Sequence, residues 1–266
     1  MLLKAIKASI LAGKAILEVY QTNFDVDFKE DKSPLTLADR RADDIIREAM
    51  KSTNLPVLSE EGEMIDHEIR QHWKQYWLVD PLDGTKEFVN RNGEFTVNIA
   101  LIENNKPVVG VIYAPTIDLL YFCNRREAFK IEKAEKQLID CESMDKLIEN
   151  STKLPLLKQH IGLILVSSRS HQHAETNLFI ENLVLQHSKI EIVSKGSSLK
   201  LCMIAEGTAD CYPRFGPTSE WDTAAGHALV NASGGKLVLA ENTALELSYN
   251  KINLLNPSFI AYSKTS

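Results

Sequence analysis

Residues 77–88 read WLVDPLDGTKEF, and this stretch joins an apolar run to two aspartates and a Gly-Thr pair. An apolar run bounded by turn-forming residues predicts a buried strand, which should end at the first aspartate. Pro81 fixes the backbone just after this strand, so that Asp80 and Asp83 can both turn toward one site. The backbone carbonyl of Leu82 can serve the same site. The stretch therefore predicts a strand-to-loop junction that carries oxygen ligands.

The end of the same stretch predicts a place for a phosphate. Gly84 and Thr85 should begin the following helix, where free backbone N–H groups and the helix dipole favour an anion. Residues 80–85 thus offer metal ligands and a phosphate cradle in one hexapeptide.

Acids recur at other junctions between a strand or loop and a helix. These further segments are TLAD at 36–39, SEE at 59–61 and EWDTAAG at 220–226. Magnesium takes one or two carboxylates per ion, together with water and substrate phosphate, so this set suits two or three ions. In the alternative interpretation Asp83 and Asp222 are helix N-caps, and Glu60 and Glu61 are ordinary surface acids. The combination of all these motifs in one chain favours a metal site.

The rest of the chain predicts a layered α/β architecture in two halves. Amphipathic helices are expected over residues 2–20 and 37–51. Apolar β-rich runs with short turns follow and indicate an antiparallel meander. Beyond the polar segment at 142–159, strands and helices alternate. We expect an N-terminal α+β half, residues 1–158, with the metal ligands, and a C-terminal α/β half, residues 159–266, with the substrate-binding residues.

Composition narrows the class of protein. The chain has 266 residues, 44% of them hydrophobic and 25% charged, as in ordinary globular proteins. Its net charge of −6 argues against binding of duplex nucleic acid, which normally requires a basic surface. A small anionic substrate could still bind, because a bound metal supplies positive charge locally. Four scattered cysteines without a CxxC pair indicate reduced thiols and a cytoplasmic protein. The sequence leaves the oligomeric state open.

The N-terminal segment is the only candidate for contact with a membrane. Lysines interrupt its apolar residues, so it is expected to be an amphipathic helix and not a signal peptide. We expect a packed surface helix; the alternative is weak peripheral contact with the cytoplasmic face of the inner membrane.

The motifs SEE, WLVDPLDGTKEF and EWDTAAG, in this order and spacing, resemble the metal-binding signatures of the inositol monophosphatase-like phosphatases. These phosphatases include the 3'(2'),5'-bisphosphate nucleotidases. The resemblance covers essentially the whole chain and implies their α-β-α-β-α sandwich. It also implies that two or three Mg²⁺ ions are bound by Glu60, Asp80, the carbonyl of Leu82, Asp83 and Asp222.

The same resemblance implies a mechanism. Asp39 and Thr85 match the pair that orients the attacking water, and Glu60 is counted with them as catalytic. The family hydrolyses its substrates directly, in line and without a phosphoenzyme. Physically this is a two-metal arrangement, in which one ion activates water and another stabilises the leaving oxygen.

Three segments of the second half bear on the substrate. SSRSH at 167–171, GSSLK at 196–200 and YPRFG at 212–216 resemble bisphosphate nucleotidases more than inositol monophosphatases. By that similarity Ser197, Lys200 and Arg214 bind the nucleotide and its non-scissile phosphate, while His171 lies near the base. In the alternative interpretation Ser197 and Ser198 are N-capping residues, and Lys200 and Arg214 are solvated surface charges.

The leading hypothesis is hydrolysis of adenosine 3',5'-bisphosphate to AMP and phosphate, with 3'-phosphoadenylyl sulfate as a second substrate. The resemblance further implies inhibition by lithium and removal of a by-product of sulfate activation. One alternative is an inositol monophosphatase or sugar bisphosphatase with the same metal centre. Another is a non-catalytic metal- or nucleotide-binding protein, which would not need Thr85. Phosphatases with an aspartyl nucleophile separate their two aspartates by one residue, whereas two residues separate Asp80 from Asp83.

Overall fold

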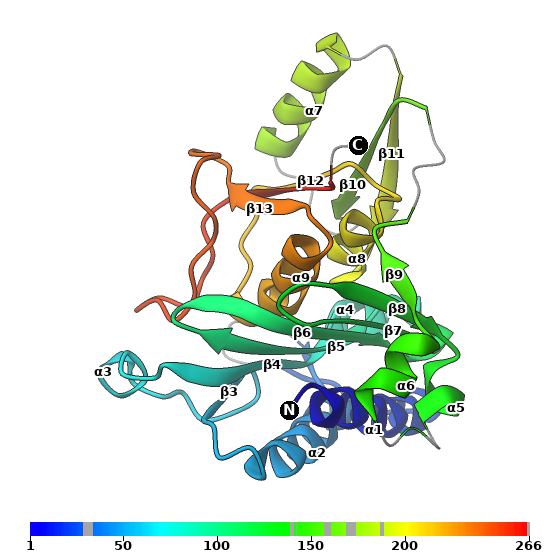
Figure 1. Ribbon diagram of the computed structural model, residues 1–266, viewed down its shortest axis with the longest axis vertical. Helices are drawn as coiled ribbons and strands as arrows, with labels where there is room; N and C mark the ends of the chain where they lie inside the picture. Colours follow the sequence, from blue (N-terminus) through cyan, green and yellow to red (C-terminus); the bar gives the residue numbers. More distant parts are fainter. Residues whose placement is uncertain are drawn as a thin grey trace.

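The computed structural model describes residues 1–28, 34–138, 141, 143–156, 161–168, 174–186 and 189–264. Figure 1 shows a helix pair, a large sheet, a second helix pair, a smaller sheet and an outer helix stacked in layers. The expected layered α/β architecture is therefore confirmed. The two larger sheets fall on either side of residue 158, but the division into two domains at this residue stays a prediction.

The first layer consists of α1 (Leu2–Tyr20) and α2 (Leu37–Lys51), which have the predicted bounds. Ile6 and Ile16 of α1 are fully buried in one core cluster with residues of the large sheet. This agrees with the apolar stripe that the sequence predicts for the helix. No helix in the described part of the chain is both long enough and apolar enough to cross a membrane.

The large sheet has seven strands in the order β3-β4-β5-β6-β7-β8-β9. Among the described pairings of this sheet only that of β3 with β4 is parallel, so the expected antiparallel meander is confirmed. The strands are β3 (Val57–Ser59), β4 (Gln75–Asp83), β5 (Thr96–Glu103), β6 (Lys106–Ala114), β7 (Leu119–Cys123), β8 (Ala128–Glu132) and β9 (Thr152–Leu154).

Strand β4 continues three residues beyond its predicted end at Asp80. Its pairing with β5 shifts register between Asp80 and Asp83, and Asp83 then lies opposite Thr96. Pro81 lies within this irregularity, where it does not have to donate to the ladder. The predicted boundary was wrong because pairing resumes after the proline, yet both aspartates remain at the same end of the strand.

Short elements connect these layers. They are β1 (Asp27–Phe28), β2 (Pro34–Leu35), α3 (His67–Arg70), α4 (Thr85–Val89), the 3-10 turn η1 (Pro115–Ile117), α5 (Ala134–Leu138) and α6 (Met144–Glu149).

The smaller sheet is mixed, with the strand order β11-β10-β12-β14-β13. Its strands are β10 (Leu163–Ser168), β11 (Ile190–Lys195), β12 (Cys211–Arg214), β13 (Lys236–Leu239) and β14 (Phe259–Tyr262). The helices of this half are α7 (Ala174–Gln186), α8 (Leu199–Glu206) and α9 (Glu220–Ala232). Helix α9 begins at Glu220, because Ser219 caps it.

Helices α8 and α9 lie between the two sheets (Figure 1) and share one core cluster with both of them. A Cβ atom on Gly110 of β6 would lie 2.3 Å from the carbonyl oxygen of Ala225 in α9. Such an approach of helix and strand requires a residue without a side chain. Because Ala225 lies about one helical turn beyond Asp222, this contact also fixes Asp222 relative to the sheet that carries Asp80.

Candidate active site

Three carboxylates from separate elements meet at one place. Glu60 follows β3, Asp80 lies in β4 and Asp222 lies in the first turn of α9. One oxygen of each lies within 4.8 Å of the others. The N–H of Glu60 donates to the carbonyl of Val79, 3.1 Å away, which holds Glu60 beside β4. Glu60 is therefore part of a carboxylate cluster and not an isolated surface acid.

The electrostatics of this cluster call for a cation. Burial raises the pKa of Asp222 well above its ordinary value, and the charges of Asp83 and Glu60 raise it further. Carboxylates gathered in this way repel each other unless one of them is protonated or a positive charge lies between them. Hard divalent cations prefer such oxygen ligands, so the donor set fits Mg²⁺.

Asp83 lines the same cavity as these three carboxylates, and one of its oxygens accepts several hydrogen bonds. Its Oδ2 accepts hydrogen bonds from the Ser198 N–H at 2.6 Å and from the Ser198 and Ser197 hydroxyls, both at 2.7 Å. Asn98 adds a fourth donor at 3.2 Å. These contacts fix the orientation of the carboxylate, whose other oxygen is the one suited to a metal. The role of Asp83 as a ligand stays a prediction.

The sequence interpretation did not include Asn98. This residue is fully buried in β5, directly opposite Asp80 in the register of the sheet. Its amide in the middle of the apolar run FTVNIALIE is the signal that could have identified it, because a buried polar side chain requires partners.

Asp39 and Thr85 are brought together as expected. The Thr85 hydroxyl lies 3.3 Å from Asp39 Oδ1 and 3.2 Å from the carbonyl oxygen of Leu82. The second oxygen of Asp39 accepts from the N–H and the hydroxyl of Thr36, at 2.7 and 2.6 Å, in the capping box of α2. The helix start thus holds Asp39 in place for Thr85.

A buried ammonium group lies on another side of the site. Lys200 is only 6% exposed, and its Nζ donates to the carbonyl of Ser197 at 2.6 Å and to that of Lys195 at 3.4 Å. Burial lowers the pKa of Lys200 to about 8, although the charge of Asp83 acts in the opposite direction. The alternative that Lys200 is a solvated surface charge is wrong.

Arg214 joins Lys200 as a second buried cation. It is 8% exposed, and its Nη2 donates to the carbonyl of Pro217 at 2.9 Å. Its Nε is buried and has no hydrogen-bond partner among the described residues. A buried donor without a partner is costly, so this group is suited to an anionic ligand. Arg214 is therefore not a solvated surface charge either.

The interpretation of Asp83 and Asp222 as helix N-caps is wrong, whereas that of the serines is right for the position of Ser198 alone. The N-cap of α4 is Gly84 and not Asp83, and the N-cap of α9 is Ser219 and not Asp222. Ser198 stands at the N-cap of α8 but makes no side-chain capping bond there, because its hydroxyl binds Asp83.

One cavity of about 260 Å³ connects the acids to the cations. Gly84 lines it with φ of +92°, a conformation that favours glycine. His171 lies outside the described residues. The predicted residues that line the cavity are Glu60, Asp80, Leu82, Asp83, Gly84, Thr85, Ser197, Lys200, Arg214 and Asp222. Further lining residues, to which the sequence interpretation gave no individual role, include Lys86, Glu87, Tyr212, Thr218, Thr223 and Phe259.

The loop before α8 is attached to the first half by contacts that no local pattern reveals. Glu94 Oε2 accepts from the Gly196 N–H at 2.8 Å, and the Thr96 and Ser197 hydroxyls lie 2.6 Å apart. The partners are about 100 residues apart in the chain. The Ser197 hydroxyl is thus engaged by the protein itself, and its expected contact with substrate stays a prediction.

Comparison with known proteins agrees with this geometry. A sequence profile of the inositol monophosphatase family matches residues 1–264. The chain is 43% identical over 252 residues to the Salmonella typhimurium protein named 3'(2'),5'-bisphosphate nucleotidase CysQ, with 93% of this chain and 94% of that protein covered. It is 35% identical over 254 residues to the Haemophilus influenzae protein of the same name, with coverages of 94% and 87%.

Solved structures give the same result. The crystal structure of CysQ from Bacteroides thetaiotaomicron, described as a bacterial member of the inositol monophosphatase family, superposes with a TM-score of 0.91 at 47% identity. That superposition covers 99% of this chain and 97% of the other. Because profile, relatives and structure all span nearly the whole chain, the resemblance expected from the motifs is confirmed, and the chain belongs to the inositol monophosphatase family of phosphatases.

Proposed function

We propose that this chain is a Mg²⁺-dependent 3'(2'),5'-bisphosphate nucleotidase that hydrolyses adenosine 3',5'-bisphosphate to AMP and phosphate. The observation that carries the proposal is the presence of Lys200 and Arg214 in the same cavity as the acidic cluster. A nucleotide bisphosphate has one phosphate to be cleaved beside the acids and another that needs fixed positive charge. The relatives described above bear the name of this activity.

The carboxylate cluster would bind the metal. Glu60, Asp80 and Asp222 would bind Mg²⁺, with Asp83 and the carbonyl of Leu82 completing the set for two or three ions. When bound, the ions supply positive charge that activates water and stabilises the leaving oxygen. The protein contributes the orientation of these oxygens, which the hydrogen bonds at Asp83 and the capping of α9 maintain.

Asp39 and Thr85 would orient the attacking water. The Thr85 hydroxyl directs its proton toward Asp39 or the Leu82 carbonyl, so its oxygen keeps lone pairs with which to accept a hydrogen bond from water. Glu60 would act beside this pair. A water held in this way can attack the phosphorus in line, and the ester oxygen departs with a proton as the nucleoside hydroxyl.

The cations would bind the phosphate that is not cleaved. Arg214 offers a planar guanidinium, whose donors match the geometry of a phosphate. Lys200, with a pKa of about 8, remains largely protonated at neutral pH. Both groups have already lost their hydration shell through burial, so a phosphate dianion gains more from them than it would from surface charges. Ser197 and His171 complete the proposed substrate-binding set.

Three finer expectations accompany the proposal. We expect 3'-phosphoadenylyl sulfate as a second substrate, because it has the same 3'-phosphate. Lithium should inhibit by replacing one Mg²⁺ ion. We expect a cytoplasmic enzyme, with weak peripheral membrane contact through α1 as the alternative to a purely packed helix. An inositol monophosphatase or sugar bisphosphatase with the same metal centre remains the alternative function.

Phosphate release from three substrates tests the proposal. The kcat/KM values for adenosine 3',5'-bisphosphate, inositol 1-phosphate and fructose 1,6-bisphosphate are compared with and without Mg²⁺. We expect Mg²⁺-dependent turnover with a clear preference for the nucleotide. A preference for the inositol or sugar phosphate would contradict the substrate assignment and leave the metal centre in place.

A further inference from the structure

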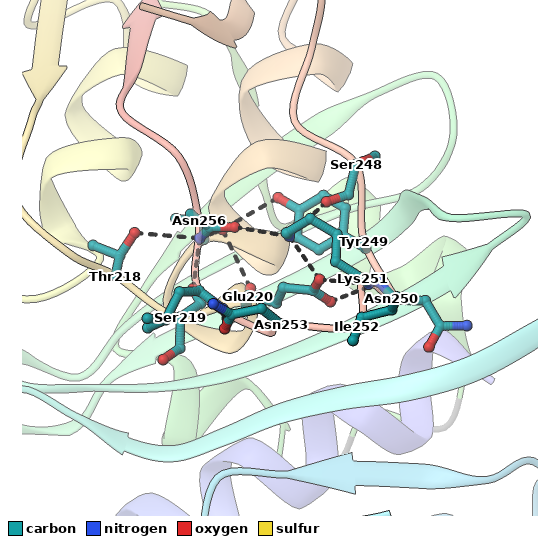
Figure 2. Close-up of polar contacts among 12 residues, drawn as sticks. Thr218, Ser219, Glu220, Ser248, Tyr249, Asn250, Lys251, Ile252, Asn253 and Asn256 are labelled. Carbon is teal, nitrogen blue, oxygen red and sulfur yellow. Dashed lines mark hydrogen bonds and ion pairs between the residues drawn. The ribbon is translucent and has the colours of Figure 1, made fainter. Parts of the chain in front are cut away.

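Residues 248–256 form a loop, here called the clasp, that wraps around the N-terminus of α9. Figure 2 shows the clasp gathered around Glu220, the first residue of that helix. The Glu220 side chain is fully buried. Its carboxylate accepts from the Asn250 N–H at 2.7 Å, the Lys251 N–H at 3.0 Å and the Lys251 ammonium at 2.6 Å. Three fixed donors therefore define the orientation of a carboxylate that does not line the cavity.

A second residue of the clasp, Asn256, connects this ion pair to the site. Its Oδ1 lies 3.4 Å from Lys251 Nζ, and its amide donates to the carbonyl of Ser219 at 2.7 Å. The same amide reaches the hydroxyls of Thr218 at 3.2 Å and Thr223 at 3.0 Å. Both threonines line the cavity. Figure 2 shows Asn256 between Thr218 and Lys251.

Ser219 carries the connection to the metal ligands. Its N–H donates to Asp222 Oδ2 at 2.8 Å in the capping box of α9. This bond holds one oxygen of the Asp222 carboxylate and so constrains the orientation of the group. Any movement of Ser219 would therefore rotate the Asp222 carboxylate within the cluster.

The clasp is also attached to the first half of the protein. The buried Arg70 of α3 donates to Asn250 Oδ1 and to the carbonyl of Ile252, both at 2.9 Å. The Asn250 amide returns a bond to the Arg70 carbonyl at 2.7 Å. The N-terminus of α9 is thus fixed to the half that supplies Glu60 and Asp80.

Stability alone does not account for this arrangement. The Lys251 side chain is 26% exposed and that of Glu220 is fully buried, so the attraction between them is largely offset by the lost hydration of the carboxylate. The ion pair instead fixes the orientation of the groups that it contacts. Groups that orient metal ligands through hydrogen bonds influence metal affinity without touching the ion.

We propose that Glu220, through Lys251 and Asn256, is a positioning residue for Asp222 and for the Thr218 side of the cavity. The inference rests on the proposed function, because that proposal assigns a divalent metal to the carboxylate cluster. The ion pair holds the clasp, the clasp holds Ser219, and Ser219 sets the orientation of Asp222.

Direct measurement of Mn²⁺ binding tests the inference without relying on turnover. The free Mn²⁺ signal in electron paramagnetic resonance gives the dissociation constant of the wild type, E220Q, N256A and the control E206Q. Glu206 is a matched control, because it is 6% exposed and pairs with Lys130 at 2.7 Å and with the Tyr121 hydroxyl at 2.8 Å. It does not line the cavity. Circular dichroism establishes that each variant is folded.

We expect E220Q and N256A to bind Mn²⁺ roughly 10-fold more weakly, or worse, and E206Q to stay within about twofold of the wild type. Excess Mg²⁺ should then restore much of the kcat of E220Q. Asn256 is only half-buried, so N256A decides the matter if E220Q does not fold. Wild-type affinity in these variants, or an equal loss in E206Q, would overturn the inference.

The outcomes separate the inference from the proposed function. Retained Mn²⁺ affinity in E220Q and N256A, beside Mg²⁺-dependent hydrolysis of the nucleotide by the wild type, would overturn only the inference. If both variants bind Mn²⁺ more weakly but the wild type does not hydrolyse the nucleotide bisphosphate, only the substrate assignment would be overturned. A wild type that does not bind Mn²⁺ would overturn the inference together with the metal assignment.

Discussion

Asp83 and Ser198 meet across the two halves of the protein: one carboxylate oxygen of Asp83 accepts both the N–H of Ser198, at 2.6 Å, and its hydroxyl, at 2.7 Å. The oxygen that accepts from these donors fixes the position of the carboxylate, and our proposal assigns the other oxygen to a metal. An amide in place of the carboxylate can still accept from Ser198 through its carbonyl oxygen. It would then present an NH₂ group to the metal side.

From this geometry we expect D83N to remain folded and to lose activity. The kcat/KM for the nucleotide should fall about 100-fold or more, because a charged ligand becomes a donor at nearly constant volume. Steady-state kinetics and thermal unfolding in EDTA measure the two effects. Near-normal activity would remove Asp83 from the metal site.

A second prediction concerns the Thr85 hydroxyl. T85A should lower kcat by roughly 100-fold with little change in KM, because the lost group acts on the attacking water and not on substrate binding. T85S keeps a hydroxyl that can reach Asp39 and should retain most of the activity. Equal losses in the two variants would show that the methyl group matters and not the hydroxyl.

A third prediction concerns the buried ammonium of Lys200. K200M should raise KM for adenosine 3',5'-bisphosphate by about 10- to 100-fold, the value of a hydrogen bond to a charged group, and should leave KM for a 3'-monophosphate much less affected. K195M is the matched control, because Lys195 pairs with Glu94 and does not line the cavity. Equal changes on both substrates would exclude Lys200 from binding the second phosphate.

Metal removal gives a fourth prediction. Mg²⁺ at about 100 times its dissociation constant should stabilise the protein by about 2.7 kcal/mol, and EDTA should reverse the gain. Burial and the charges of Asp83 and Glu60 disfavour the ionised form of Asp222 and raise its pKa. In EDTA, D222N should therefore unfold at a temperature no lower than that of the wild type. The same variant should lose most of its response to Mg²⁺ in thermal unfolding. A full response in D222N would contradict the metal assignment.

A fifth prediction concerns the contact between β6 and α9. G110A would place a methyl group 2.3 Å from the Ala225 carbonyl and should lower the free energy of unfolding by about 1–3 kcal/mol. The helix must move away from the sheet, so metal affinity should fall as well. Denaturant unfolding and Mn²⁺ titration measure the two effects, and an unchanged stability would show that the helix has room to adjust.

The sequence points to acids that the structure brings together, because they lie in short local motifs. DPLDGT contains the candidate ligands and the helix start together, and a helical period of 3.6 predicts where α1 and α2 lie. The end of β4 was missed because a residue that follows a proline can rejoin the ladder, which depends on the partner strand and not on the local sequence. Asp83 therefore lies in a strand and not in a loop.

What the sequence does not predict is the set of contacts between distant segments. Asn98 faces Asp83 only because β5 pairs with β4 in one register, and Glu94 binds Gly196 only because the second half folds onto the first. The same holds for Glu220 and Lys251, which are 31 residues apart. Such partners depend on tertiary packing, so no spacing rule identifies them in one sequence.

The central claim is that one cavity binds a cleaved phosphate at the acids and a second phosphate at the cations. The most direct test compares kcat/KM of the wild type, in Mg²⁺, for adenosine 3',5'-bisphosphate and adenosine 3'-monophosphate. The account predicts a preference of roughly 100-fold or more for the bisphosphate, because two buried charged donors contact only that substrate. Equal values for the two nucleotides would contradict it.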